Sequence, residues 1–366
     1  MSQSLPSHLR HFLGLYNGRM SGEALSARDW DTAIRIGWSA GMLGSFAERM
    51  RANKVTVPPE AERHFEAIQS TVRFRHRMAH LELDRVAEVL APLDVPIIVA
   101  KGAAYMLQDL PCGRWRLFAD VDIIVPRDRI GEVEQILHAH GWQSETLDPY
   151  DQHYYRAWSH ELPPMRYASH PLELDVHHTI LPLTGRIQPD AEGLFDASRR
   201  IEGTPFLVLC PEDQVLHACA HLFQDSDLSD RMRELADIDG LLRAFGSASG
   251  FWNRLEARAE LHEMQRPLWY ALRYARAYFD TPVPSEFFDT QAPSYLIVTT
   301  MDALTRAALP PCNPDRKPNP MVRSARLMLY IRSLWLRMPP WLLLRHLLKK
   351  GLRRVGEKEQ AEPVAP

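Results

Sequence analysis

The pattern of apolar and polar residues predicts helices over the first ninety residues. After Pro58 and Pro59, residues 62–90 space their apolar side chains near the period of one helix face, with charged residues between them. These apolar positions are Phe65, Ile68, Val72, Ala79, Val86 and Leu90. The prolines are therefore expected to divide two long helical segments.

The period changes at residue 95. Residues 95–100 (VPIIVA) form a short β-branched run of strand length, and Lys101 and Gly102 end it before a helical pattern begins. Residues 119–125 (ADVDIIV) read as a second strand, and residues 127–141 after it as a helix that stops at a glycine. The predicted order is strand, helix, strand, helix.

Two more strand candidates follow, at residues 171–180 (PLELDVHHTI) and 206–209 (FLVL). Residues 210–224 begin with a proline and acids, which suit a helix N-terminus, and helical patterns continue to about residue 280. We predict a small mixed sheet between helical regions, without internal repeats. The predicted regions are a helical N-terminus (1–90), a core (91–210), a helical domain (211–310) and a basic tail (311–366).

Composition indicates an ordinary soluble globular protein, because 45% of the 366 residues are hydrophobic and 24% are charged. The four cysteines form no CxxC pair, so neither a zinc knuckle nor a disulfide framework is predicted. The sequence contains neither an export signal at its start nor the run of about 18 apolar residues that spans a membrane. We therefore expect a cytoplasmic location.

Charge is concentrated at one end of the chain. Residues 316–356 hold 11 Lys and Arg and no Asp or Glu, which leaves 32 Lys and Arg against 46 Asp and Glu elsewhere. A basic segment rich in Leu and Trp can contact an anionic membrane surface or another polyanion, or dock on the acidic body. Pro339 and Pro340 predict two short helices there. The membrane reading places the protein at the inner membrane surface.

Candidate chemistry begins with Asp120 and Asp122, which share one face of the second predicted strand. Two neighbouring carboxylates repel each other, and a divalent cation removes that cost. If Asp175 lies on an adjacent strand, three carboxylates converge and can hold Mg²⁺. The alternatives are a solvated strand end for the pair, and Glu173, which has the same strand parity, in place of Asp175.

The turn after the first strand fits phosphate binding. Gly102 has no Cβ to obstruct an approaching phosphate, and Lys101 can add a point charge. Arg116 could help to position the phosphate or the Asp120 and Asp122 pair, or it could simply pair with a surface acid. His217 and His221 are expected to pack near the site.

Two further features are read mainly as structural. His160 and His177 could each be a hydrogen-bonded structural residue rather than a ligand-binding one. Asp237 and Asp239 are expected to make helix-surface contacts, since on a helix they cannot face the same way.

These elements together resemble a known family. The segments that carry the resemblance are KGAAYMLQ, Arg116 ahead of ADVDIIV, HELPPMRY, LELDVHH and PEDQVLHACAH. They are similar to those of bacterial uncharacterised nucleotidyltransferases of the DNA polymerase β-like superfamily. The resemblance covers roughly residues 90–245. It implies an α+β nucleotidyltransferase fold, in which a small mixed sheet with helices is flanked by helical regions.

The resemblance also implies a reaction, in which an NMP group moves from a nucleoside triphosphate such as ATP to a hydroxyl of a small molecule, sugar or protein, with release of pyrophosphate. Asp120, Asp122 and Asp175 would hold two Mg²⁺ ions and act in catalysis. The nucleotide-binding residues would be Lys101, Gly102, Ala103, Arg116, His160 and His177.

The chain departs from the wider superfamily at the turn, where many members have serine after the glycine. Here Ala103 follows Gly102, and 17 residues separate Gly102 from Asp120, more than is usual. The missing hydroxyl motivates an alternative, a catalytically degenerate binding module of the antitoxin type. A second alternative is a metal-dependent glycosyltransferase that uses a nucleotide sugar. The base, the acceptor, the pathway and the oligomeric state stay open.

Overall fold

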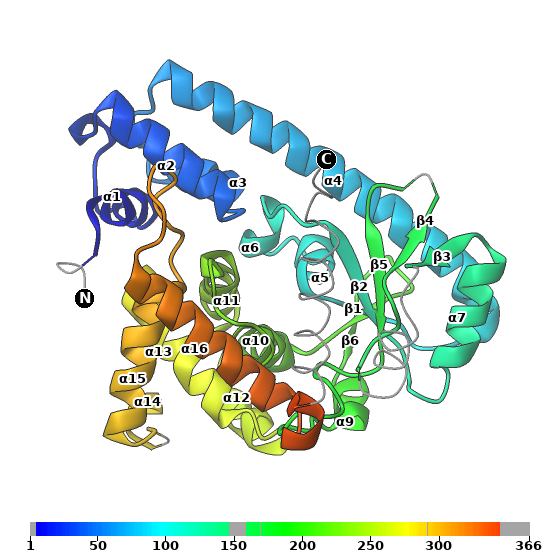
Figure 1. Cartoon of the computed structure of the whole chain (residues 1–366). Coiled ribbons are helices and arrows are strands. Elements are labelled where there is room, and N and C mark those ends of the chain that lie inside the picture. Colours follow the sequence, from blue (N-terminus) through cyan, green and yellow to red (C-terminus); the bar gives the residue numbers. More distant parts are fainter. Residues whose placement is uncertain (1–4, 146–158, 169, 291, 345–366) are drawn as a thin grey trace, which may run out of the picture.

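The computed structural model describes residues 5–145, 159–168, 170–290 and 292–344, and they include a mixed sheet of seven strands (Figure 1). Their order across the sheet is β3-β4-β5-β2-β1-β7-β6. The strands are β1 (Ile98–Ala100), β2 (Asp120–Ile124), β3 (Trp142–Ser144), β4 (Met165–Tyr167), β5 (Glu173–His177), β6 (Arg199–Arg200) and β7 (Leu207–Val208). The predicted α+β class with a small mixed sheet is confirmed.

The four strand candidates correspond to β1, β2, β5 and β7. Strands β3, β4 and β6 were not predicted, because they are as short as β1 and β7 but, unlike these, do not lie in an apolar run. Strand β2 lies at the centre, antiparallel to β1 and parallel to β5. The parallel register sets Asp122 directly opposite Asp175.

The N-terminal region differs from the sequence expectation. Before the prolines there are three helices, not one long segment: α1 (Ser7–Tyr16), α2 (Ala27–Ser39) and α3 (Leu43–Ala52), with a 3-10 turn η2 (Gly22–Ala24). Gly18 and Gly41 have φ of 69° and 65° and allow the chain to turn after α1 and α2. Helix α4 (Pro59–Leu90) then forms as predicted, with Pro59 in its first turn.

Helix α4 extends from the N-terminal helices to the far strands of the sheet (Figure 1). Near its middle, Arg75 donates to the carbonyl of Pro171 at 2.8 Å. Further along, Glu82 is buried and accepts a hydrogen bond of 2.6 Å from the indole of Trp142 at the start of β3. These contacts fix α4 to the sheet.

The remaining helical elements are the 3-10 turn η3 (Ala91–Leu93), α5 (Lys101–Leu107), α6 (Pro111–Arg114), α7 (Ile130–Ala139), α9 (Ala191–Asp196), α10 (Pro211–Ala220), the π turn η4 (His221–Asp225), α11 (Met232–Phe245), α12 (Phe251–Leu261), α13 (Gln265–Phe279), α14 (Phe287–Thr290), α15 (Tyr295–Ala308) and α16 (Pro320–Arg337). One buried apolar cluster runs from Leu9 to Leu329. It spans all four predicted regions, and their division into domains stays a prediction.

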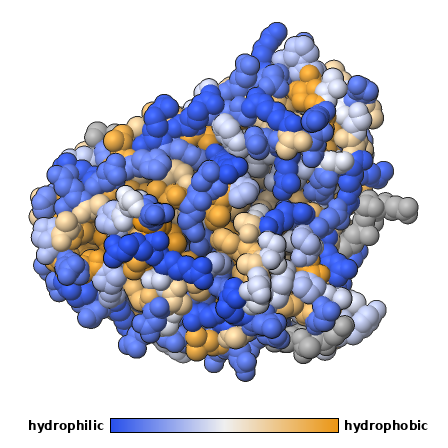
Figure 2. Space-filling view, turned by 180° about the vertical axis from the view of Figure 1, so that it is seen from behind, coloured by the Kyte–Doolittle hydropathy of each residue, from blue (hydrophilic) through white to orange (hydrophobic). Residues whose placement is uncertain are grey.

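Helix α16 carries the described part of the basic tail. Arg326 pairs with Asp230 at 2.6 Å, and Arg332 donates to the carbonyl of Phe223 at 2.7 Å. The helix ends before Pro339, and the second predicted short helix falls largely outside the described residues. In the described part of the chain, no helix has the length and apolar character that crossing a membrane requires. The face seen from behind is mostly hydrophilic, with smaller apolar groups between polar residues (Figure 2).

A buried ion pair anchors α10 to α12. Asp213 in its first turn is fully buried and accepts two hydrogen bonds from Arg258 of α12. Burial by itself raises the pKa of Asp213, but the neighbouring His262 and the hydrogen bonds from Arg258 outweigh it and hold the pKa below its ordinary value. The stability that this carboxylate contributes is therefore present above its ordinary pKa and is lost as the pH falls through the lowered value.

Replacing Arg258 by methionine should destabilise the fold by about 3 to 5 kcal/mol, because it leaves Asp213 buried and without its main partner. Urea unfolding at neutral pH measures the change. The control is Arg114→Met, since the Arg114 pair with Asp109 is exposed and its loss should change stability little. Equal stability of the two variants would contradict the anchoring role of the Asp213 pair.

Candidate functional site

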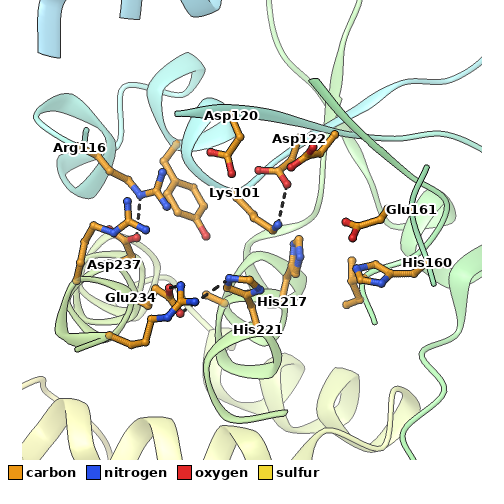
Figure 3. Close-up of a pocket in the computed structure, with 16 residues that line it drawn as sticks. Lys101, Arg116, Asp120, Asp122, His160, Glu161, His217, His221, Glu234 and Asp237 are labelled. Atoms are coloured by element: carbon orange, nitrogen blue, oxygen red, sulfur yellow. Dashed lines mark hydrogen bonds and ion pairs between the residues drawn. The ribbon is translucent and has the colours of Figure 1, made fainter. Parts of the chain in front are cut away.

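A cavity of about 300 Å³ lies between the carboxylate-bearing face of β2 and the helices α10 and α11 (Figure 3). On the side of the sheet and its loops it is lined by Lys101, Tyr105, Arg116, Asp120, Asp122, His160, Glu161, Asp175 and Ile180. On the helix side it is lined by His217, Ala218, His221, Arg231, Arg233, Glu234 and Asp237. Most of these side chains are ionisable, so the cavity is suited to a charged ligand.

The three predicted carboxylates meet at this cavity. Asp120 and Asp122 share one strand face, while the alternating Val121 and Ile123 are fully buried on the other. Ligand atoms of Asp122, Asp175 and His177 lie within 4.8 Å of one another. Asp175 Oδ1 is buried without a hydrogen-bond partner among the described residues. An orphaned carboxylate oxygen beside further oxygen donors fits a divalent cation.

Lys101 compensates part of the negative charge. It takes the left-handed conformation, with φ of 47°, at the end of β1, and its Nζ lies 2.7 Å from Asp122 Oδ1. Burial alone would lower the pKa of Lys101, but the charge of Asp122 raises it above its ordinary value. Lys101 is therefore a fixed ammonium beside the carboxylates (Figure 3).

The two facing carboxyls have opposite pKa shifts. Burial acts to raise the pKa of Asp122, but Lys101 and His177 outweigh it and bring the pKa well below its ordinary value. The pKa of Asp175 rises to about 7, first because of burial and then because of the charge on Asp122. Without a metal ion, one member of the pair is ionised and the other readily keeps a proton, as expected for carboxylates that share a site.

Gly102 leaves space for a neighbouring guanidinium. A Cβ at this position would lie 1.9 Å from Nη1 of Arg116, so the missing side chain makes room for the guanidinium. Arg116 in turn donates to Asp237 at 2.8 Å, and both side chains are about nine-tenths buried. Neither Gly102 nor the buried Ala103 is among the residues that line the cavity.

The expectation that Asp237 and Asp239 make helix-surface contacts is wrong. Both are buried in α11, because this helix packs against α6, α10 and α13 and so has little exposed surface along these turns. Asp237 binds Arg116, and Asp239 accepts hydrogen bonds from Arg243 and Thr281, both at 2.7 Å. Charge alternation in a sequence does not distinguish such buried pairs from a solvated face.

His177 joins two acids. Its Nε2 lies 3.0 Å from Asp122 Oδ1, and its Nδ1 lies 3.2 Å from Glu161 Oε2. Burial alone lowers the pKa of His177, but the hydrogen bond with Asp122 and the charge of Glu161 raise it above its ordinary value. The ring of His160 lies beside it, with 5.2 Å between the ring centroids.

Sequence reasoning missed several residues of the helix wall. Arg231, Arg233 and Glu234 stand at the start of α11, and Arg233 donates to the carbonyl of Leu117 at 3.0 Å. The charge of Arg116 is the main cause that lowers the pKa of Arg233, so two guanidinium groups lie close together. Such a pair favours an anion between or beside its members. His217 and His221, predicted to pack near the site, line the same wall.

Comparison with known protein families matches residues 26–280 to a family described as uncharacterised nucleotidyltransferase. Among solved structures, an antigenic nucleotidyltransferase-like protein from Paracoccidioides brasiliensis is similar at a TM-score of 0.30 and 15% identity, over 56% of this chain and 96% of that chain. A similarity at this score and identity supports no conclusion about the function of this chain. No curated protein matches the chain.

The Asp175 carboxyl should titrate near pH 7 in the metal-free protein, as measured by carbon-detected NMR of labelled aspartates. The Asp122→Asn variant should lower this pKa, because it removes the repelling charge. The Asp175 carboxyl resonance is assigned as the signal that is missing from the spectrum of the Asp175→Asn variant. An ordinary pKa for Asp175 in the unmodified protein, or one that does not move in Asp122→Asn, would contradict the described coupling.

Proposed function

Because the chain belongs to this family of uncharacterised nucleotidyltransferases, we propose that it moves an NMP group from a nucleoside triphosphate to a hydroxyl acceptor and releases pyrophosphate. The observation that supports this most is the placement of three carboxylates and an ammonium on one side of the cavity. Arg116 and Arg233 add positive charge to the same cavity. A triphosphate with divalent cations needs both kinds of group.

Asp120, Asp122 and Asp175 are the residues that we propose to hold Mg²⁺. Bound there, the metal would neutralise charge on the phosphate oxygens and stabilise the attacking and leaving oxygens of an in-line displacement. Both Lys101 Nζ and His177 Nε2 approach Asp122 at Oδ1, so we assign Oδ2 to the metal. A second ion at Asp122 would compete with Lys101, since both carry positive charge.

The protein side chains supply orientation and proton transfer. Arg116, held by Asp237, and Arg233, held at the Leu117 carbonyl, would contact the β- and γ-phosphates, where negative charge accumulates as pyrophosphate leaves. Asp175 would complete the metal site through Oδ1, and its other carboxylate oxygen would accept the proton of the acceptor hydroxyl. The acceptor class stays as predicted, a small molecule, a sugar or a protein hydroxyl.

The transfer should be measured with the four NTPs labelled at the α-phosphate, incubated with Mg²⁺ and fractions of a cell extract. Asp120→Asn and Asp122→Asn should each lower label transfer by about 10³-fold, because several kcal/mol of charge stabilisation is lost. Circular dichroism checks that each variant is folded.

The matched control is Glu173→Gln. Glu173 lies opposite Asp120 in the sheet register, yet it pairs with Arg166 and does not line the cavity. This variant should keep its activity. Undiminished label transfer in both aspartate variants would rule out the assignment.

We also propose that α16 contacts an anionic membrane surface. Its outer face exposes Leu327, Met328, Ile331 and Trp335, and the exposed Arg316, Lys317 and Arg323 lie at or just before its first turns. Apolar side chains next to cations suit the headgroup region of an anionic bilayer. Such contact would bring the protein to the inner membrane surface without a spanning helix.

The variant Leu327→Ser/Ile331→Ser should bind vesicles that contain phosphatidylserine at least about tenfold more weakly, because two apolar side chains no longer enter the bilayer. Binding by the unmodified chain should weaken with added salt. The control is Leu81→Ser, an exposed leucine of α4. Equal vesicle binding by the double variant and the control would reject the membrane contact.

A further inference from the structure

The segment 160–162 extends the sheet next to the end of β5. Glu161 forms an antiparallel bridge with His177, the amide of Leu162 donates to the carbonyl of Val176 at 2.9 Å, and the amide of His178 donates to the carbonyl of His160 at 2.9 Å. Backbone pairing thus holds His160 and Glu161 beside His177. Side chains on paired backbone are positioned more precisely than side chains on a free loop.

The side chains of His160, Glu161 and His177 form a group of potential metal ligands. Their ligand atoms lie within 4.8 Å of one another, and both histidines are more than nine-tenths buried. The group contains two imidazoles and one carboxylate, whereas Mg²⁺ prefers oxygen ligands. Two histidines with a glutamate are a ligand set found in catalytic zinc sites.

The contacts of His177 point to a positive charge at its Nδ1. A neutral imidazole carries one N–H, so it can donate to Asp122 or to Glu161 but not to both. The second contact needs either an additional proton or a metal ion. A metal-binding histidine commonly donates its other N–H to a carboxylate, and Asp122 Oδ1 is in position to accept from Nε2.

His160 distinguishes these two possibilities. Its Nδ1 is buried and has no hydrogen-bond partner among the described residues, and an unsatisfied buried nitrogen is costly. A proton on His177 leaves His160 Nδ1 as it is. A metal ion held by the three side chains would take one nitrogen of His160, and coordination through Nδ1 would satisfy this atom together with Glu161 and His177 Nδ1.

We propose that His160, Glu161 and His177 bind a transition-metal dication of the Zn²⁺ class, and that Asp122 orients His177. Three protein ligands leave a fourth position, and His160 and Glu161 both line the cavity. The residues proposed for Mg²⁺ are Asp120, Asp122 and Asp175, so the two sites share no carboxylate, and His177 lies between them, close to Asp122 and Asp175 as well as to Glu161. Either site can therefore fail while the other stands.

Titration of the chelator-treated full chain with Zn²⁺ and with Co²⁺ tests the proposal, by calorimetry and by the visible absorption of bound Co²⁺. We expect one ion per chain with nitrogen ligands, retained in excess Mg²⁺. His160→Gln and Glu161→Gln should each weaken Zn²⁺ binding by at least the factor of about 10 to 100 that the loss of an outer-shell partner costs. Asp122→Asn should weaken it within that range.

The matched controls are His140→Gln, an exposed histidine after α7, and Glu173→Gln on β5. Both should bind Zn²⁺ as the unmodified chain does. Glu161 is about a quarter exposed, so its variant should fold even if a histidine variant does not. Absence of Zn²⁺ binding, displacement of Zn²⁺ by Mg²⁺, or unchanged affinity in Glu161→Gln would overturn the proposal, and His177 would then be a protonated bridge between two acids.

Discussion

The parallel pairing of β2 with β5 places two aspartates face to face in a nearly closed environment. Asp122 is 2% exposed and stands opposite Asp175 in the register. Two carboxylates so close cannot both ionise without compensation. The ammonium of Lys101, the imidazole of His177 and the raised pKa of Asp175 are the ways in which the protein meets this constraint.

The same constraint explains the surroundings of the pair. Lys101 reaches Asp122 from the start of α5, and Gly102 next to it leaves the space that Arg116 fills. Arg116 is oriented by Asp237 of α11, so the sheet wall and the helix wall are linked through one buried ion pair. The arrangement is anionic at the strands and cationic beside them, which suits a substrate with negative charge and bound cations.

The sequence was sufficient for the parts of the site that follow from local periodicity. Asp120 and Asp122 share a face because strand side chains alternate, and the apolar runs of residues 95–100 and 119–125 identified β1 and β2. The contact of Arg116 with Asp237 joins residues 121 positions apart, and no local pattern encodes it. Arg233 and Glu161 were missed for the same reason, because their proximity to the carboxylates arises only from tertiary packing.

Calorimetry of Mg²⁺ binding in buffers of different ionisation enthalpy tests the central claim that a cation replaces a proton at the carboxylate pair. At one pH unit below the pKa of Asp175, where this carboxyl is almost fully protonated, binding should release close to one proton per ion, because Asp175 must give up its proton to become a ligand. The release should fall at higher pH and vanish in Asp175→Asn. Mg²⁺ binding without proton release, or with the same affinity and release in that variant, would contradict the account.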